Sequence, residues 1–151
     1  MEPFEFDEEQ NSHINDIVEQ YESSVRNNHT LFLDAESFEI LADFYEFRGD
    51  INIARSIIQQ ALEQHPFSSL ILIKKAQLEF EAKECDEALK TLNKAEIIDS
   101  SESGIYLLKA EIFTFLSKYE EAIQILEDRL LVTDVEDLAD IHLQMTDVYE
   151  D

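Results

Sequence analysis

The stretch that decides the fold is AESFEILADFYEFRGDINIARSIIQQALEQHPFS, residues 35–68 of the 151-residue chain. Both halves carry apolar residues at helical spacing, and a Gly49-Asp50 pair separates them. Gly49 suits a left-handed end to the first helix, and Asp50 can cap the second. Each half also has a small residue, Ala42 or Ala54, where two antiparallel helices would cross closely. The stretch therefore predicts a tightly packed pair of antiparallel helices.

The same pattern returns at a period of 34 residues. Shifting the sequence by 34 aligns two columns of alanine and three columns of bulky apolar residues: Ala42/Ala76/Ala110, Ala54/Ala88/Ala122, Phe38/Leu72/Tyr106, Phe44/Leu78/Ile112 and Ile58/Leu92/Leu126. Five columns at one period are hard to obtain by chance, and periods of about 20–50 residues are typical of solenoids and other repeat arrays. The chain is therefore divided into three repeats, 35–68, 69–102 and 103–136.

Residues 35–68 resemble a tetratricopeptide repeat (TPR) over their full length. The resemblance rests on Phe38-x2-Leu41-Ala42-x2-Tyr45, the Gly49-Asp50 turn, Ala54-x3-Ile58-x2-Ala61 and the terminating Pro66. The later repeats keep the alanine columns but depart elsewhere, with Glu79 at an aromatic position, Ser100 at the proline and Arg129 at the last alanine. The resemblance implies an all-α, TPR-type α-α solenoid, a right-handed superhelix of antiparallel helix pairs.

The apolar pattern predicts seven helices, over 11–27, 36–48, 51–64, 69–82, 85–97, 103–116 and 119–131, and an eighth from about 135. Residues 1–10 are acidic and expected to be flexible. Residues 11–34 are interpreted as an N-terminal capping helix and loop. The capping helix is inferred from one apolar stripe: Ile14, Ile17, Val18, Tyr21 and Val25.

Residues 137–151 match the first helix of a fourth repeat, after a capping box at Thr133-Asp-Val-Glu136. This segment is either a C-terminal cap or the cut end of a longer array, of which this chain would be an N-terminal fragment. The fragment is favoured because Tyr149 lacks a partner helix. A lone last helix would leave an apolar patch partly uncovered and favour a weak homodimer. The patch is predicted to contain Leu126, Leu130, Ile141, Met145, Val148 and Tyr149.

Composition excludes several classes of function. Thirty-five acidic residues against 11 basic ones give a formal charge of -24, which disfavours binding to nucleic acid or to a membrane surface. Two isolated glycines cannot form a phosphate-binding loop, and the four histidines lack the same-face spacing of metal sites. The lone Cys85 fits a reducing, cytoplasmic setting. No cofactor, no metal and no enzymatic activity are expected.

The TPR resemblance implies a concave groove lined by the first helix of each repeat. By register the lining residues are Glu36, Glu39, Asp43 and Glu46, then Leu70, Ile73, Gln77 and Phe80, then Leu107, Glu111 and Thr114. The alternative is a solvated acidic face beside apolar residues buried against neighbouring helices. Some TPR domains hold acidic chaperone tails with a clamp of Lys, Arg and Asn, and the charge here is the reverse. A peptide or helix with basic and apolar residues is therefore the expected ligand.

Two functions follow from this reading. The favoured one is a non-catalytic TPR scaffold or adaptor that binds a partner protein in its groove. The alternative is a structural self-assembly domain that oligomerises through its open C-terminal repeat.

Overall fold

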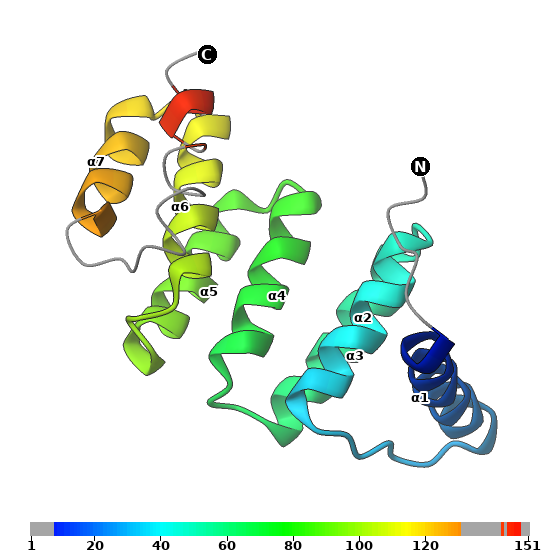
Figure 1. The fold of residues 1–151 in the computed structure, drawn as a ribbon. Helices are drawn as coiled ribbons and strands as arrows, with labels where there is room; N and C mark the ends of the chain where they lie inside the picture. Colours follow the sequence, from blue (N-terminus) through cyan, green and yellow to red (C-terminus); the bar gives the residue numbers. More distant parts are fainter. Residues whose placement is uncertain (1–7, 131–142, 144, 149–151) are drawn as a thin grey trace. The chain divides into compact units, whose positions relative to one another are not determined.

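The computed structural model describes residues 8–130, 143 and 145–148, and every regular element within them is α-helical (Figure 1). The helices are α1 (Glu8–Asn27), α2 (Ala35–Phe47), α3 (Ile51–Gln64), α4 (Ser69–Glu81), α5 (Cys85–Ile98), α6 (Ser103–Phe115) and α7 (Tyr119–Leu130). The predicted all-α class is confirmed, and these seven helices agree with the predicted ranges to within three residues. The expected start of an eighth helix near residue 135 lies outside the described residues.

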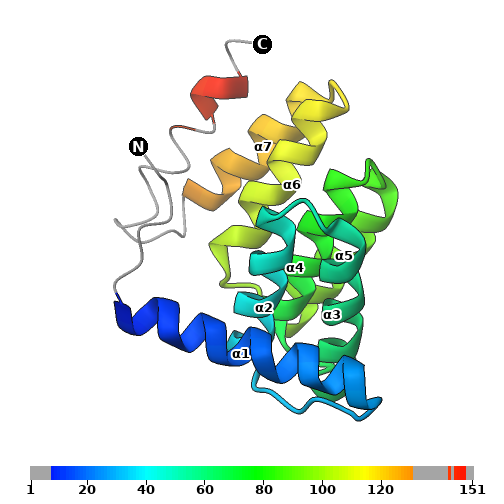
Figure 2. The same ribbon diagram turned by 90° about the vertical axis from the view of Figure 1, so that its right-hand side faces the viewer.

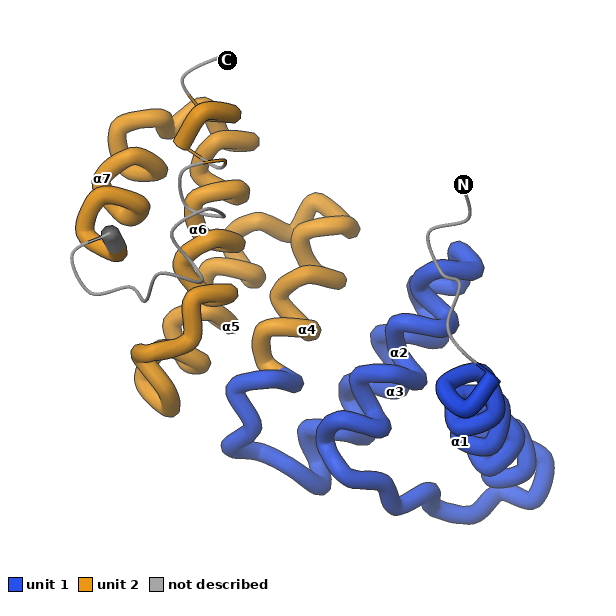
Figure 3. Tube along the Cα trace, viewed as in Figure 1, with its two compact units in different colours: residues 1–71 blue, residues 72–151 orange. Residues whose placement is uncertain are grey.

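The chain forms two compact units, which Figure 3 colours separately. The N-terminal unit, residues 1–71, contains α1, α2, α3 and the first residues of α4. The C-terminal unit, residues 72–151, contains the rest of α4 with α5, α6 and α7. Within the N-terminal unit, α1 packs on α2 and runs crosswise to it (Figure 2).

The α2–α3 pair has a buried apolar core, and the side chain of Asp34 caps the start of α2. Phe38, Ala42 and Ala54 are all fully buried, as expected for residues at a close helix crossing. Asp34 caps α2 by accepting a hydrogen bond from the Ser37 backbone N–H at 2.7 Å. This hydrogen bond lowers the pKa of Asp34, because it stabilises the charged carboxylate.

The C-terminal unit repeats the same packing. The alanines Ala76, Ala88, Ala110 and Ala122 are fully buried, so all six residues of the two alanine columns occupy crossing positions. Val148 packs against Ala110, Ala122 and Leu126 in one cluster.

The turns between paired helices repeat as well. Gly49, Lys83 and Ser117 have positive φ angles of 85°, 64° and 61°, and they are spaced 34 residues apart. The predicted left-handed end at Gly49 is confirmed and recurs at two non-glycine residues. Asp50 is the N-cap residue of α3, as predicted, but its side chain makes no capping hydrogen bond. The recurring turn supports the 34-residue register independently of side-chain packing.

Three expectations about the flanks need correction. Residues 8–10 are helical, because α1 begins at Glu8, where Glu8 and Glu9 interact favourably with the helix dipole. Val25 is 61% exposed, and the buried position belongs to Ser24. Leu126 and Val148 were expected to be partly exposed, but both are buried and belong to the same apolar cluster. Ile141, Tyr149, the side chain of Leu130 and the capping box at 133–136 lie outside the described residues.

Candidate protein-binding site

The predicted acidic residues lie on α2 in the N-terminal unit. Glu36 and Asp43 are exposed, and Glu39 and Glu46 are half-buried. No lysine or arginine occurs in this helix. The field around α2 is therefore strongly negative, which attracts cations and repels anions at long range. Leu70, also predicted to line the groove, is half-buried at the start of α4.

A hollow of about 470 Å³ opens between α4 and α6 in the C-terminal unit. Four of the predicted groove residues line it together: Gln77, Phe80, Leu107 and Glu111. Ile73 lies beside them, 3.9 Å from the position that a Cβ at Gly104 would take. Thr114 is not among the lining residues, and its hydroxyl donates to the Ala110 carbonyl of its own helix at 2.7 Å.

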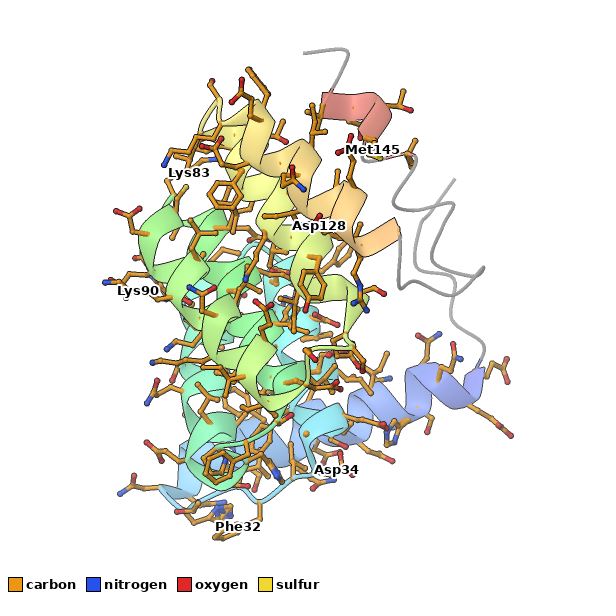
Figure 4. All side chains as sticks on the ribbon, turned by 90° about the vertical axis from the view of Figure 1, so that its left-hand side faces the viewer. Phe32, Asp34, Lys83, Lys90, Asp128 and Met145 are labelled. Atoms are coloured by element: carbon orange, nitrogen blue, oxygen red, sulfur yellow. The ribbon has the colours of Figure 1, made fainter. Side chains whose placement is uncertain are left out.

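Phe80, which lines this α4–α6 hollow, forms an aromatic pair with Phe115 at the end of α6. The rings of Phe80 and Phe115 meet edge to face with centroids 5.6 Å apart, a favourable arrangement for aromatic side chains. Lys83, at the turn after α4 (Figure 4), places its ammonium 4.6 Å from the centre of the Phe115 ring. Phe115 is 51% exposed, so the pair presents apolar surface to solvent.

Sequence reasoning missed Phe115 and Lys83 because it selected only the groove face of each first helix. Phe115 lies inside the predicted helix 103–116 but was not assigned to its groove face, and Lys83 lies in the turn after α4. The signal available was the 34-residue period, which places Lys83 at the left-handed position of Gly49.

Glu111 adds a carboxylate to the α4–α6 hollow. Neighbouring atoms remove part of its water, and this desolvation raises the pKa of its carboxyl. A cationic group placed beside it would favour the charged form and so bind more strongly than to a fully solvated carboxylate.

A second hollow, of about 600 Å³, lies between α1 and α2 in the N-terminal unit. Its lining residues are Gln10, His13, Ile14, Ile40, Asp43, Phe44, Glu46 and Phe47. Asp43 and Glu46 were predicted groove residues, but α1 was treated only as a cap and not as a wall of a site. The position of α1 across α2 creates this hollow, and no sequence motif encodes it.

The described residues also bear on metal binding and on the environment of the cysteine. In the described part of the chain, no group of three or more His, Cys, Asp and Glu side chains is arranged to hold a metal ion. Cys85 is buried at the start of α5, where it packs as a small apolar residue. Among residues 8–130, 143 and 145–148, no helix combines the length and the hydropathy of a membrane span.

The fold is similar to those of solved TPR domains. The TPR2B domain of yeast Sti1, in complex with a Hsp70 peptide, shares 18% identity, with a TM-score of 0.67 over 77% of this chain and 96% of that one. The second TPR domain of human RPAP3, in complex with the Hsp70 peptide SGPTIEEVD, shares 20% identity, with a TM-score of 0.61 over 76% and 94%. The Thermus thermophilus TPR protein TTC0263 shares 16% identity, with a TM-score of 0.68 over 88% and 71%.

These identities establish the fold alone. No curated protein sequence matches the chain. A family profile does: that of Iml2/Tetratricopeptide repeat protein 39 matches residues 20–132, which is most of the chain and includes α2 to α7 entirely. The predicted TPR resemblance is therefore confirmed, and the chain belongs to the Iml2/Tetratricopeptide repeat protein 39 family.

Proposed function

We propose that this chain is a non-catalytic binding module for a partner segment that carries basic and apolar residues. The α4–α6 hollow is the observation that carries the proposal, because Gln77, Phe80, Leu107 and Glu111, four residues that the register assigned to a groove, line it together. TPR domains are protein–protein interaction modules and are typically non-catalytic.

Charge distinguishes the proposed ligand from those of the solved neighbours. The RPAP3 domain was solved with SGPTIEEVD, a peptide with three acidic residues and no basic one. In this chain α2 carries four carboxylates and no cationic side chain, and Glu81 and Glu111 line the α4–α6 hollow. Lys83 is the single cation that lines this hollow. Like-charge repulsion therefore disfavours an acidic peptide, and a basic one is expected.

A direct test compares two labelled peptides by fluorescence anisotropy. One is a 14-residue amphipathic peptide of Leu and Lys, and the other is SGPTIEEVD. We expect the Leu–Lys peptide to bind, with affinity that falls as salt rises, because exposed charges are screened. We expect the acidic peptide not to bind. Equal binding of both peptides would contradict the proposed ligand chemistry.

The apolar contribution is tested with Phe80→Ala. Truncating a central aromatic contact should weaken binding of the Leu–Lys peptide about tenfold, or about 1.4 kcal/mol, without changing the salt dependence. Ile97→Ala is the matched control, since Ile97 is an apolar residue of the same unit that is 86% exposed on α5. If the two variants bind alike, the α4–α6 hollow is not the site.

A further inference from the structure

The α1–α2 hollow is an open wedge between crossing helices. Helices that cross touch where they pass and diverge on either side. The contact in this unit includes Ile17, which is 3% exposed, and the edge-to-face pair of Tyr21 and Tyr45 with ring centroids 5.4 Å apart. Beside this contact α1 and α2 leave a space of about 600 Å³. That volume lies within the range of about 300–1,000 Å³ that is typical of ligand sites.

The lining of this hollow combines apolar side chains with carboxylates. Ile14, Ile40 and Phe44 supply apolar surface, and Asp43 supplies a carboxylate at their edge. Phe47 also lines the hollow, although its side chain is 65% exposed. An exposed aromatic residue beside an apolar, charge-rimmed concavity is the arrangement found at contact sites, because covering it removes apolar surface from water.

The charge of the surrounding helices selects the occupant. α1 and α2 together carry nine acidic residues, against Arg26 in α1 and Arg48 at the end of α2, whose guanidinium lies 5.4 Å from the centre of the Phe44 ring. The acidic residues are Glu8, Glu9, Asp16, Glu19, Glu22, Glu36, Glu39, Asp43 and Glu46. A second copy of the chain would bring the same negative charge to the interface, and the chain's own segment 2–7 has three carboxylates and no basic residue. Like-charge contact opposes both occupants, whereas a cationic segment is attracted.

We propose that the α1–α2 hollow is a second docking site, which receives a bulky apolar side chain of a partner segment flanked by Lys or Arg residues. It depends on the proposed function only in requiring a protein partner of basic and apolar chemistry. The two sites belong to different units and share no lining residue. Each can therefore be removed by substitution without touching the other.

The test uses the full chain with Phe80→Ala as background, so that the α4–α6 site is weakened. The probe is the 14-residue Leu–Lys peptide, and methyl NMR of Ile14 and Ile40 reports where it binds. We expect both methyl signals to shift on titration. Adding Phe47→Ala, or Asp43→Lys, should raise the Kd about tenfold, because the first removes an aromatic contact and the second places a like charge against the Lys residues of the peptide.

Two matched controls separate docking from general effects. Phe67→Ala removes an aromatic residue of the same unit that is 80% exposed and does not line the hollow. Glu63→Lys makes the same change from a carboxylate to an ammonium as Asp43→Lys in the same unit, at an exposed position of α3 outside the hollow. Both controls should leave the Kd within about twofold of the background, because residues away from the docked segment contribute little to binding energy.

Several outcomes would overturn the proposal. If the peptide shifts signals of the C-terminal unit but not Ile14 or Ile40, the second site fails while the proposed function stands. If the peptide shifts the Ile14 and Ile40 signals but Phe80→Ala does not weaken binding to the parent chain, the second site stands while the proposed function fails. Equal binding of a Leu–Glu peptide would contradict the charge argument. Sedimentation that shows a dimer broken by Phe47→Ala would identify a second copy as the occupant instead.

Discussion

The first two helix pairs fill the same two interior positions with opposite chemistry. In α2–α3 these positions hold Tyr45 and Ile57, both buried. Thirty-four residues later, in α4–α5, they hold Glu79 and Thr91, which are 5% and 3% exposed. The Thr91 hydroxyl donates a hydrogen bond to Glu79 Oε1 at 2.6 Å. The third pair returns to aromatic and aliphatic residues at these positions.

This difference shows that the repeat interior tolerates polar residues when they change together. A single buried hydroxyl or carboxylate without a partner is destabilising, because it loses its hydrogen bonds to water. Glu79 and Thr91 provide a partner for each other across the two helices. The repeats therefore share the two alanine crossings and the left-handed turn, whereas the side chains packed around these features differ.

Thr91→Val is expected to have the largest effect on stability. Valine has nearly the same shape but cannot donate to Glu79, so a buried acceptor loses its partner. We expect the free energy of unfolding to fall by about 1.5–3 kcal/mol, the range for hydrogen bonds to charged groups. Urea denaturation followed by circular dichroism measures this. Thr114→Val is the control, since that hydroxyl bonds within its own helix, and it should cost less than about 1 kcal/mol.

The double variant Glu79→Tyr/Thr91→Ile tests whether the two positions act as a pair. It transfers the residues of α2–α3 into α4–α5 and removes both polar groups at once. Stability should return to within about 1 kcal/mol of the parent, because replacing a buried polar pair by apolar residues is often neutral. Additive losses from the two single changes would show that the hydrogen bond does not couple them.

Overpacking a crossing should have the next largest effect, and it should be similar in both pairs. Ala54→Leu and Ala88→Leu each place a larger side chain where the existing one is fully buried. We expect a cost of about 1–3 kcal/mol for each, measured by thermal and urea unfolding. Ala82→Leu, at an exposed turn position, serves as control. If Ala88→Leu alone is tolerated, α4–α5 does not cross as closely as α2–α3.

At the three left-handed turn positions, exchanging glycine and non-glycine residues should change the free energy of unfolding by about 0.5–1 kcal/mol. Non-glycine residues pay a steric penalty at positive φ that glycine avoids, although glycine adds entropy to the unfolded chain. Ser117→Gly should therefore stabilise the protein by about 0.5–1 kcal/mol. Lys83→Gly should gain less, because the lysine ammonium above the Phe115 ring is lost. Gly49→Ala should destabilise, and by the backbone alone, since nothing lies within 4 Å of the added Cβ.

The elements that the sequence predicted well are those in which one residue type has a single structural use. Alanine at a fixed period marks a close crossing, and glycine after an apolar run marks a left-handed helix end. The alanine rule applies to the helix pairs of both units, and the glycine rule applies to the end of α2.

The sequence analysis missed features that depend on two residues at once. Glu79 was read as a weakened contact, because Thr91 was not considered beside it. Arg129 was read as a departure from the repeat. It reaches the preceding turn instead, where its Nη2 donates to the Ser101 carbonyl at 2.7 Å and its guanidinium lies 4.5 Å from the centre of the Tyr106 ring. Both are contacts between helices or turns and leave no periodic signal.

The candidate site was predictable only in part for the same reason. The acidic face of α2 follows from one helix, and register placed four residues at the α4–α6 hollow. The α1–α2 hollow requires the crossing of α1 over α2, which apolar periodicity does not specify.

The smallest expected effect concerns a second polar pair of the C-terminal unit, Glu96 of α5 and Lys109 of α6. Glu96 stands where the first repeat has Leu62, so it extends the comparison. The ammonium of Lys109 donates a hydrogen bond to the Glu96 carboxylate, and this lowers the pKa of that carboxyl. A group with a lowered pKa in the folded state stabilises the fold above its ordinary pKa. That contribution is lost as pH falls through the lower, folded-state value.

Lys109→Met isolates this contribution, because the hydrophobic stem is kept and the charge is removed. The parent should exceed the variant in free energy of unfolding at pH 7 by less than about 1 kcal/mol, since the Glu96 side chain is 38% exposed and water screens the pair. The difference should shrink in urea titrations as pH falls below the ordinary range of glutamate. Lys90→Met is the control: Lys90 pairs with Glu87, and both side chains are more than half exposed. A difference between parent and Lys109→Met that does not change with pH would mean that Lys109 acts by packing alone. Of these two polar pairs, only Glu79–Thr91 would then stabilise the fold through a polar interaction.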